Sequence, residues 1–218
     1  MRKILLVLGD MLSGKTSLCK SLFSRLTALS LKPYAIVEEN ERDDLGIPVK
    51  LFLHELNTGK ISLLGTREAS RHQAPTEASK YTKSTLPKSL QASSPLIACA
   101  RENYGPFKFS AEVFVEAASR LTSAWNDGFS PIILDEVGPL ELLERAGFRE
   151  WLIWALSQKD CFLVISMRPG LKSSFMDLID ANTLDAQGLA IKSFSFAELN
   201  DEKMLEALSK EILRHCHD

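Results

Sequence analysis

The feature that most constrains this chain is a short loop near its N-terminus. An aliphatic run from Ile4 to Leu8 leads into Gly9-Asp-Met-Leu-Ser-Gly14-Lys15-Thr16, which fits the pattern GxxxxGK[ST] at every fixed position. Leucines at helical spacing then continue from Lys15 to Leu29. A buried strand, a glycine-containing loop and an amphipathic helix in this order predict an α/β fold whose loop binds a phosphate chain.

Phosphate chemistry explains the residue types in this loop. Glycines allow successive backbone N–H groups to face one anion, and the N-terminus of the following helix adds its positive end. The pattern assigns Lys15 to the β and γ phosphates and Thr16 to Mg²⁺. We expect contacts with a nucleotide along the whole loop, from Gly9, Asp10, Met11, Leu12, Ser13, Gly14, Lys15, Thr16 and Ser17.

A second motif is the aliphatic run Ile132-Ile-Leu134, which is followed by Asp135 and Glu136. The carboxyl ends of strands are where ligands bind in open α/β sheets. We expect Asp135 to hold Mg²⁺, directly or through water, and Glu136 to orient or deprotonate an attacking water. An apolar run followed by Asp-Glu also describes a strand that meets solvent, but the phosphate loop upstream favours the functional interpretation.

The rest of the chain alternates strand and helix patterns, which predicts a largely parallel sheet between layers of helices. Two strand-like runs around Asn57-Thr58-Gly59 predict an added β-hairpin, and the acidic stretch from Glu38 to Asp44 is predicted to be a loop. Further strands are predicted at Tyr34–Val37, Cys161–Ile165 and Leu189–Phe194, with helices from Ser110 to Trp125 and from Arg149 to Leu156.

The length of 218 residues favours a single domain spanning residues 1–218. Within it, the tract from about residue 66 to 104 is rich in Ser, Thr, Ala, Gln and Pro, and its basic residues outnumber its acidic ones. So long a tract inside a compact domain is either a functional flap or a surface insertion without a role. The sequence leaves both possibilities open.

Composition excludes several classes of partner. The formal net charge of -2 argues against a chain built to coat nucleic acid or an anionic membrane, since both need a basic excess. Apolar runs fall well short of the roughly 18 residues that span a bilayer. The four cysteines are too dispersed for a paired zinc or redox motif, which favours a reduced, cytoplasmic protein. A protein partner stays possible and unidentified.

At this point a resemblance becomes specific. Residues 135–142 read Asp-Glu-Val-Gly-Pro-Leu-Glu-Leu, which is similar to the Asp-Glu-Ile-Gly-x-Met-Glu-Leu signature of a P-loop nucleoside-triphosphatase family. That family is known from thermophilic microbes and as the cancer-related NTPase of animals. Further similarities are Gly105-Pro-Phe107-Lys-Phe109, the Asn57-Thr58-Gly59 hairpin and Ser166-Met-Arg168, so that the resemblance extends from Met1 to about Phe196.

The resemblance implies the three-layer P-loop NTPase fold and Mg²⁺-dependent hydrolysis of ATP, GTP and other nucleoside triphosphates. It also favours a catalytic role for Arg168, as a cation that stabilises charge on the transferring phosphoryl group; the alternative is a surface arginine ahead of Pro169. Glu141 is ambiguous in the same way, because acidic residues also favour helix N-termini. The chain departs from the family at Leu12, where a third glycine is usual, and in its long middle tract.

The resulting prediction is a Mg²⁺-dependent nucleoside triphosphatase that releases diphosphate and phosphate. One alternative is a nucleoside or nucleotide kinase, which uses the same loop but must keep water from the phosphoryl group. A third is a nucleotide-dependent adaptor or switch, in which slow hydrolysis resets a bound partner. Glu136 beside the magnesium-binding Asp135 suits water activation, and the absence of an NKxD motif disfavours a Ras-like switch.

Overall fold

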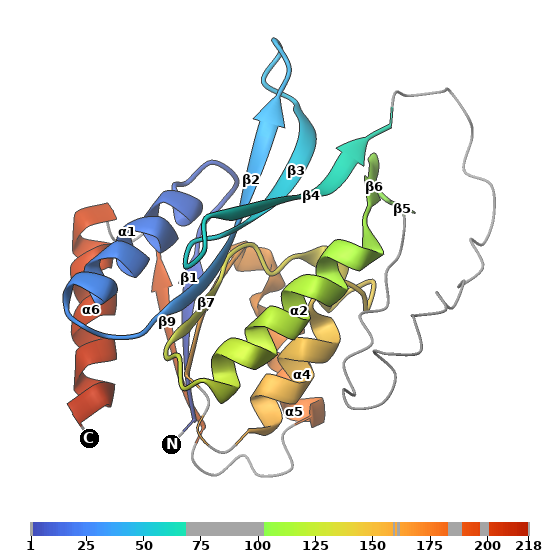
Figure 1. Ribbon diagram of the computed structural model, residues 1–218. Helices are drawn as coiled ribbons and strands as arrows, with labels where there is room; N and C mark the ends of the chain where they lie inside the picture. The colour runs from blue at the N-terminus through green and yellow to red at the C-terminus, as the bar shows by residue number, and fades with distance from the viewer. Residues whose placement is uncertain are drawn as a thin grey trace.

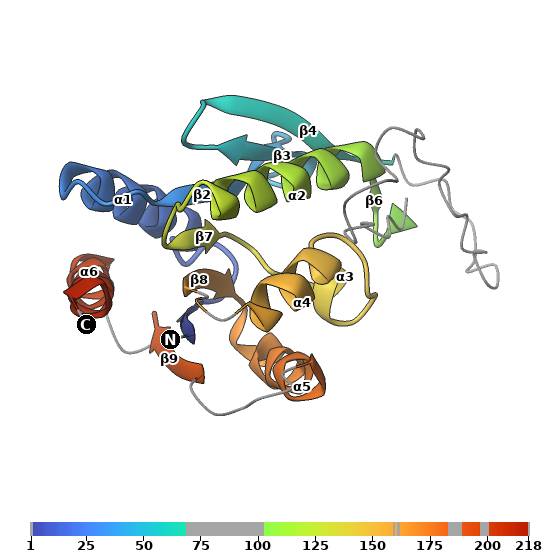
Figure 2. The ribbon, with the colours of Figure 1, turned by 60° about the horizontal axis from the view of Figure 1, so that its bottom comes forward.

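A computed structural model describes residues 2–68, 103–158, 160, 162–182, 189–196 and 201–217. Most of the tract predicted as an insertion at 66–104 lies outside the described residues. In the described part, the strands form one nine-stranded sheet in the order β5-β6-β4-β3-β2-β7-β8-β1-β9. Helices cover both faces of this sheet, as Figures 1 and 2 show.

Five neighbouring strands run parallel to one another and form one half of the sheet, in the order β2-β7-β8-β1-β9. In β1, Ile4 and Leu6 face one layer of helices while Leu5 and Val7 face the other, and all four are fully buried. Burial on both faces explains the continuous aliphatic run. These parallel strands are β1 (Arg2–Leu8), β2 (Tyr34–Arg42), β7 (Ile132–Leu134), β8 (Phe162–Met167) and β9 (Leu189–Ser195).

The other half of the sheet is antiparallel and starts from β2. The predicted hairpin is present and larger than expected, because two short strands extend it. Its strands are β3 (Pro48–Glu55), β4 (Lys60–Arg67), β5 (Asn103–Tyr104) and β6 (Phe107–Phe109). The prediction of a loop from Glu38 to Asp44 is wrong, since β2 continues to Arg42 by pairing with β3 despite its acidic side chains.

Two hydrophobic clusters fill the spaces between the sheet and the helices. One lies under α1 (Lys15–Ala28) and α6 (Asp201–His217). The other lies under α2 (Ala111–Asn126), α4 (Arg149–Ser157) and α5 (Lys172–Asn182), with the short α3 (Pro139–Leu142) beside it. This arrangement confirms the predicted α/β fold with a parallel central sheet, while the single domain over residues 1–218 stays a prediction. No helix in the described ranges has the length and apolar character needed to cross a membrane.

The strand order determines what meets at one edge of the sheet. β8 lies between β1 and β7, and all three strands run parallel. Their carboxyl ends therefore open on the same edge, where the loop at Gly9, the pair Asp135-Glu136 and the segment at Arg168 follow directly.

Candidate functional site

The loop after β1 adopts the conformation that a strand-to-helix phosphate loop needs. Gly14 begins α1 with a left-handed φ of 99°, and no side chain caps the first amide groups of this helix. Its N-terminus is therefore available to an anion. Leu12 also has a positive φ, of 62°, which glycine adopts at lower cost, and its side chain is exposed.

Inside this loop, one buried polar atom lacks a partner within the described part of the chain. The Ser13 hydroxyl is buried and makes no hydrogen bond there, although its backbone N–H donates to the Asp10 carbonyl. A Cβ at position 9 would collide with this hydroxyl, which explains Gly9. An unsatisfied buried hydroxyl is unfavourable, so the loop would gain from an oxygen ligand bound at this position.

Two interactions bring the two sequence motifs together. The Thr16 hydroxyl donates to Asp135 Oδ2 at 2.6 Å, across 119 positions of sequence. Lys15 Nζ lies 3.4 Å from Glu136 Oε1 and donates to the Asp10 carbonyl at 2.9 Å. Lys15 and Asp135 are almost fully buried. The structure thus places four of the predicted site residues in one cluster of charged and hydroxyl groups.

The donor set in this cluster suits magnesium. A hydroxyl and a carboxylate are oxygen ligands of the kind that Mg²⁺ prefers, and the site opens onto space for water and phosphate oxygens. Burial is the main cause that raises the pKa of Asp135 and of Glu136, although Lys15 opposes the effect on both carboxylates. Carboxylates that are desolvated in this way gain from a nearby positive charge. Thr16 and Asp135 therefore fit the magnesium ligands expected from the sequence.

Ser166, at the end of β8, holds the turn that carries both carboxylates. Its hydroxyl donates to Asp135 Oδ1 and accepts the backbone N–H of Glu136 at 2.9 Å, and its carbonyl accepts the N–H of Val137 at 3.0 Å. Glu136 has a φ of 58°, which is unfavourable for a residue other than glycine. Ser166 is fully buried and stabilises this strained backbone, which aims the Glu136 side chain at Lys15.

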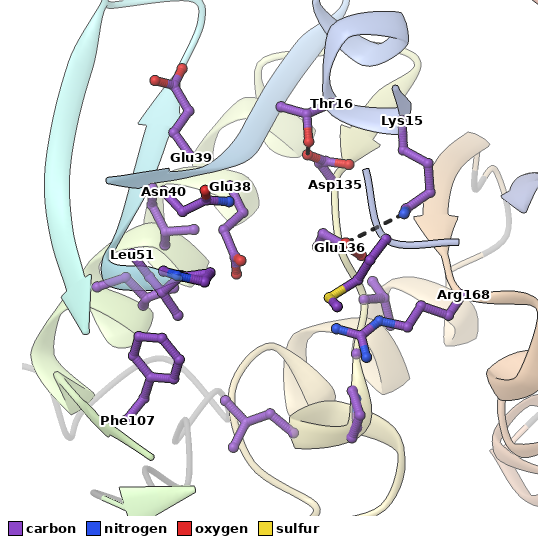
Figure 3. A pocket seen from close by; sticks show the side chains of 18 of the residues that line it. Lys15, Thr16, Glu38, Glu39, Asn40, Leu51, Phe107, Asp135, Glu136 and Arg168 are labelled. Carbon is purple, nitrogen blue, oxygen red and sulfur yellow. Dashed lines mark hydrogen bonds and ion pairs between the residues drawn. The ribbon is translucent and has the colours of Figure 1, made fainter. Parts of the chain in front are cut away.

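The sequence indicates Ser166 only as part of the Ser166-Met-Arg168 similarity and predicts no role for it. Its role depends on β8 lying between β1 and β7, which no local pattern reveals. Arg168 follows β8 and lines the same cavity as Lys15 and Glu136, as Figure 3 shows. Its charge lowers the pKa of Glu136, although burial raises that pKa more strongly. Arg168 therefore lies in the same cavity as the phosphate loop, and its catalytic role stays a prediction.

Glu38 is a site residue that sequence reasoning missed. It follows the parallel part of β2, next to β7, and its carboxylate points into the cavity between the strands of the hairpin and Glu136, as Figure 3 shows. Burial and then the charges of Glu136, Asp135 and Glu141 raise the pKa of Glu38 to about 8. A sequence signal existed, because Glu38 directly follows the apolar run Tyr34–Val37.

Glu141 of the signature supports the backbone. Its carboxylate accepts the N–H of Gly138 at 3.0 Å and that of Phe148 at 3.3 Å. Burial raises the pKa of Glu141 to about 7, against these two hydrogen bonds, which lower it. This buried carboxylate therefore ties the turn after Glu136 to the segment that leads into α4.

One cavity of about 690 Å³ is lined by Lys15, Thr16, Glu38, Asp135, Glu136, Glu141 and Arg168. One wall carries the phosphate loop, Asp135, Glu136 and Arg168, and we call it the charged wall. The opposite wall comes mainly from β3, β4 and the segment around β6, and Leu51 and Phe107 mark it in Figure 3. We call this second surface the apolar wall; it consists of Leu51, Leu53, Leu64, Tyr104, Phe107 and Phe109.

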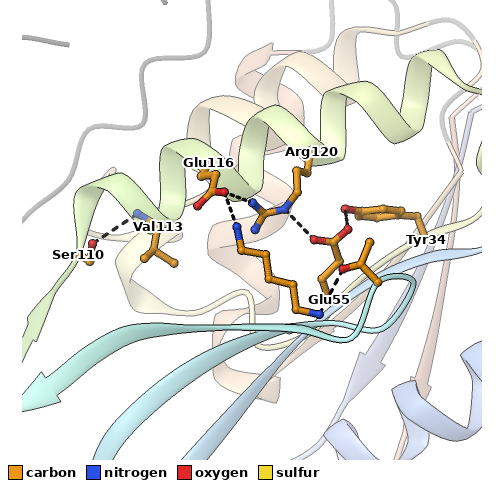
Figure 4. A network of polar contacts seen from close by, with 8 residues as sticks. Tyr34, Glu55, Ser110, Val113, Glu116 and Arg120 are labelled. Carbon is orange, nitrogen blue, oxygen red and sulfur yellow. Dashed lines mark hydrogen bonds and ion pairs between the residues drawn. The ribbon is translucent and has the colours of Figure 1, made fainter. Parts of the chain in front are cut away.

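A network of polar contacts attaches the hairpin that carries the apolar wall to β2 and α2, as Figure 4 shows. Tyr34 donates to Glu55 Oε1 at 2.5 Å, and Arg120 Nε lies 2.7 Å from Glu55 Oε2. Arg120 also contacts Glu116, which pairs with Lys60 of β4. Because Glu55 is buried, these contacts fix β3 against the helix that covers it.

Comparison with known proteins supports the fold. No family model matches the chain, and neither does any curated protein. The crystal structure of THEP1 from the hyperthermophile Aquifex aeolicus is similar, with a TM-score of 0.59 and 15% identity, over 97% of this chain and 99% of that one. The solution structure of a human cancer-related nucleoside triphosphatase gives a TM-score of 0.57 and 14% identity, over 96% of both chains. The chain therefore has the fold of these P-loop nucleoside triphosphatases, the family that its motifs resemble.

Proposed function

We propose that this protein is a Mg²⁺-dependent nucleoside triphosphatase that hydrolyses ATP, GTP and other nucleoside triphosphates to diphosphate and phosphate. The observation that carries the proposal is the cluster at one edge of the sheet. There, Thr16 contacts Asp135 and Lys15 contacts Glu136. Each contact joins the phosphate loop to the Asp135-Glu136 motif, which is more than a hundred residues away in the sequence. The names of the two similar structures point to the same class of reaction.

The triphosphate binds to the loop from Gly9 to Ser17. The amide groups at the start of α1 face its oxygens, and the buried Ser13 hydroxyl is free to donate to one of them. Lys15, which is buried and held beside Glu136, reaches the β and γ phosphates. The γ phosphate therefore lies next to Glu136.

Thr16 and Asp135 hold the magnesium ion. When bound there, Mg²⁺ supplies charge neutralisation on the β and γ phosphate oxygens. Asp135 keeps its orientation through the hydroxyl of Ser166, which donates to its second oxygen. This arrangement explains why a buried strand ends in a carboxylate.

Glu136 is the general base of hydrolysis. Its carboxylate orients the attacking water and takes a proton from it as the water oxygen attacks the γ phosphorus. Arg168 stabilises the charge that spreads over the phosphoryl oxygens in the transition state. The backbone contacts of Ser166 keep Glu136 in its strained position, so that the carboxylate does not have to be ordered during the reaction.

Two further features belong to this proposal. The dispersed cysteines and the acidic net charge favour a protein of the cytoplasm that binds small anions rather than nucleic acid. A protein partner that stimulates hydrolysis would convert the same site into a switch.

The test is phosphate release from ATP, GTP, CTP and UTP with Mg²⁺, measured on wild type and on Glu136→Gln. Removal of a general base lowers turnover by about 10²–10⁴-fold, while binding of the triphosphate is retained. The proposal is supported if wild type hydrolyses several nucleotides and Glu136→Gln does not. Binding without phosphate release by wild type, or equal turnover by both proteins, contradicts it.

A further inference from the structure

We propose that the apolar wall binds a second substrate, a hydroxyl-bearing compound with a flat aromatic body such as a nucleoside, which accepts the γ-phosphoryl group in place of water. The inference rests on the proposed function, because donor binding and phosphoryl activation use the same charged wall. It adds an acceptor site and a transfer activity that hydrolysis does not need.

The apolar wall is a rigid aromatic surface. Ring centroids are 6.1 Å apart between Phe107 and Phe109, 6.1 Å between Phe109 and Phe114, and 5.1 Å between Phe114 and Phe148. Phe114 and Phe148 are buried in the main core, whereas Phe107 and Phe109 are only partly covered. These four phenylalanine rings therefore form a continuous series from the core to the cavity, and the rings at the cavity end can contact a ligand.

Water hydrolysis alone gives no reason for such a surface. A water molecule needs polar partners, whereas Tyr104, Phe107 and Phe109 line the cavity as apolar rings that stay partly in contact with solvent. Leu51, Tyr104 and Phe107 face the cavity from separate strands of the antiparallel half. Covering this surface with the body of a ligand would remove apolar area from water, and mostly apolar walls with a few polar groups are typical of small-molecule sites.

The body that covers this wall is not the base of the donor nucleotide. Lys15 reaches the β and γ phosphates, and its ammonium lies 3.4 Å from Glu136, so the γ end of the donor lies at Glu136. The nucleoside of the donor is attached at the opposite, α end of the triphosphate. Figure 3 shows Leu51 and Phe107 across the cavity from Glu136 and Arg168. We therefore place a second ligand on the apolar wall, facing the γ end of the donor.

Glu38 supplies the polar group that such an acceptor needs. Its carboxylate lies between the two walls, with Leu51 on one side and Glu136 on the other, as Figure 3 shows. An oxygen of the Glu38 carboxyl group can accept a hydrogen bond from a second hydroxyl of the acceptor, which orients the reacting hydroxyl toward the γ phosphorus and leaves its proton to Glu136. The aromatic body then rests on Phe107 and Tyr104.

The transfer step balances without a further reactant. The acceptor hydroxyl oxygen forms a bond to the γ phosphorus, and the bond between that phosphorus and the β–γ bridging oxygen breaks. The bridging oxygen leaves with the electron pair as part of the nucleoside diphosphate. The hydroxyl proton passes to Glu136, the carboxylate that takes the water proton in hydrolysis. An acceptor that fills the apolar wall displaces the water, so transfer and hydrolysis compete.

The experiment follows γ-labelled ATP with Mg²⁺ and a panel of nucleosides, and measures labelled nucleoside monophosphate and labelled inorganic phosphate in the same reaction. Glycerol serves as the control acceptor, because it carries hydroxyls without an aromatic body. For wild type we expect a labelled monophosphate from at least one nucleoside and none from glycerol. Phe107→Ala should lower the ratio of transfer to hydrolysis by about tenfold, from the loss of one ring contact.

Matched variants keep the result interpretable. Phe129→Ala removes an equally half-buried ring that packs on Tyr34 before β7, away from the cavity, and should leave the ratio unchanged. Tyr104→Ala serves as a second test of the wall if Phe107→Ala does not fold, and Glu38→Ala should lower the ratio without weakening ATP binding.

Each outcome has a separate meaning. Phosphate release with no labelled monophosphate from any nucleoside overturns the acceptor site and leaves the hydrolase proposal standing. Transfer that Phe107→Ala and Tyr104→Ala do not reduce overturns the placement of the acceptor on this wall. Nucleosides that only compete with ATP occupy the donor site, which also contradicts the inference. Absence of both phosphate release and transfer means that the proposed function itself has failed.

Discussion

The two halves of the sheet contribute different chemistry to one cavity. The parallel half ends in charged and hydroxyl groups that belong to recognisable motifs, with Lys15 and Asp135 at their centre. The antiparallel half presents leucine and aromatic side chains that belong to no nucleotide motif. The difference teaches that the charged wall and the apolar wall are separate parts, one built on parallel and the other on antiparallel strands, and joined through β2.

The largest effect is expected where the parallel half loses its central cation. Lys15→Ala should lower phosphate release by about a thousandfold and weaken triphosphate binding, because a preorganised positive charge at the γ phosphate is lost. Kinetics and calorimetric titration with ATP check both parts. Lys210→Ala, which removes an exposed lysine of α6 outside the lining of the cavity, is the control. Turnover of Lys15→Ala near the wild-type rate would break the distinction between the two halves.

The antiparallel half should instead respond through stability. Glu55→Ala leaves the Tyr34 hydroxyl and the Arg120 guanidinium without their buried partner, and should lower the free energy of unfolding by about 3 kcal/mol. Urea denaturation measures this change. Glu206→Ala, which breaks an exposed ion pair on α6, should leave the free energy of unfolding nearly unchanged. Equal effects would mean that the network does not hold the hairpin.

Glu141 lies on the side of the parallel half, between the turn after Glu136 and α4, and its titration predicts a pH dependence. Burial raises its pKa to about 7 in the folded protein, from 4.5 as the unperturbed value. The folded state therefore binds more protons between these values, and stability is highest below pH 4.5 and falls as pH rises through 7. The loss is about 3 kcal/mol between pH 4 and pH 8. Glu141→Gln removes this dependence, so the difference in unfolding free energy between wild type and variant should fall with pH. A constant difference contradicts the assignment.

The smallest effect concerns Leu12, which occupies a left-handed position in the phosphate loop. Leu12→Gly relieves a strain of about 1 kcal/mol but adds chain entropy to the unfolded state, so we expect a gain of about 0.5 kcal/mol or less in the free energy of unfolding. Thermal denaturation shows whether Leu12→Gly raises or lowers the free energy of unfolding. Because the Leu12 side chain is highly exposed, we expect the KM for ATP to change less than about twofold. A loss of stability would show that the Leu12 side chain makes a contact of its own.

Much of the fold could be predicted because the strongest signals are local. The aliphatic run of β1, the loop from Gly9 to Thr16 and the cap Ser110 before α2 each depend on a few adjacent residues. The fold class followed from the alternation of strands and helices. The length of β2 could not be predicted, since its acidic second half is a strand only through pairing with β3.

The candidate site divides in the same way. Lys15, Thr16, Asp135 and Glu136 were found because each motif carries its own spacing, although their catalytic roles stay predictions. Glu38 was missed because the pairing of β2 brings it to the cavity, and Ser166 because strand order brings it against Asp135 and Glu136. The apolar wall was also missed as a surface. The sequence names Phe107 and Phe109 only within a similarity, and strand pairing brings them together with leucines of β3 and β4.

One feature of the antiparallel half bears on how the chain tolerates length variation. Arg67 of β4 pairs with Phe107 of β6, and the N–H of Glu68 donates to the carbonyl of Pro106 at 2.9 Å. Thr66 of β4 and Asn103 of β5 both pair with Lys108 of β6, so the ends of β4 and β5 are fixed in the sheet whatever number of residues joins them. The entropic cost of closing a chain segment grows only with the logarithm of its length, by about 0.6 kcal/mol per doubling. Insertions and deletions at this point are therefore nearly neutral for folding, and they fall at the rim of the surface that we propose selects the acceptor.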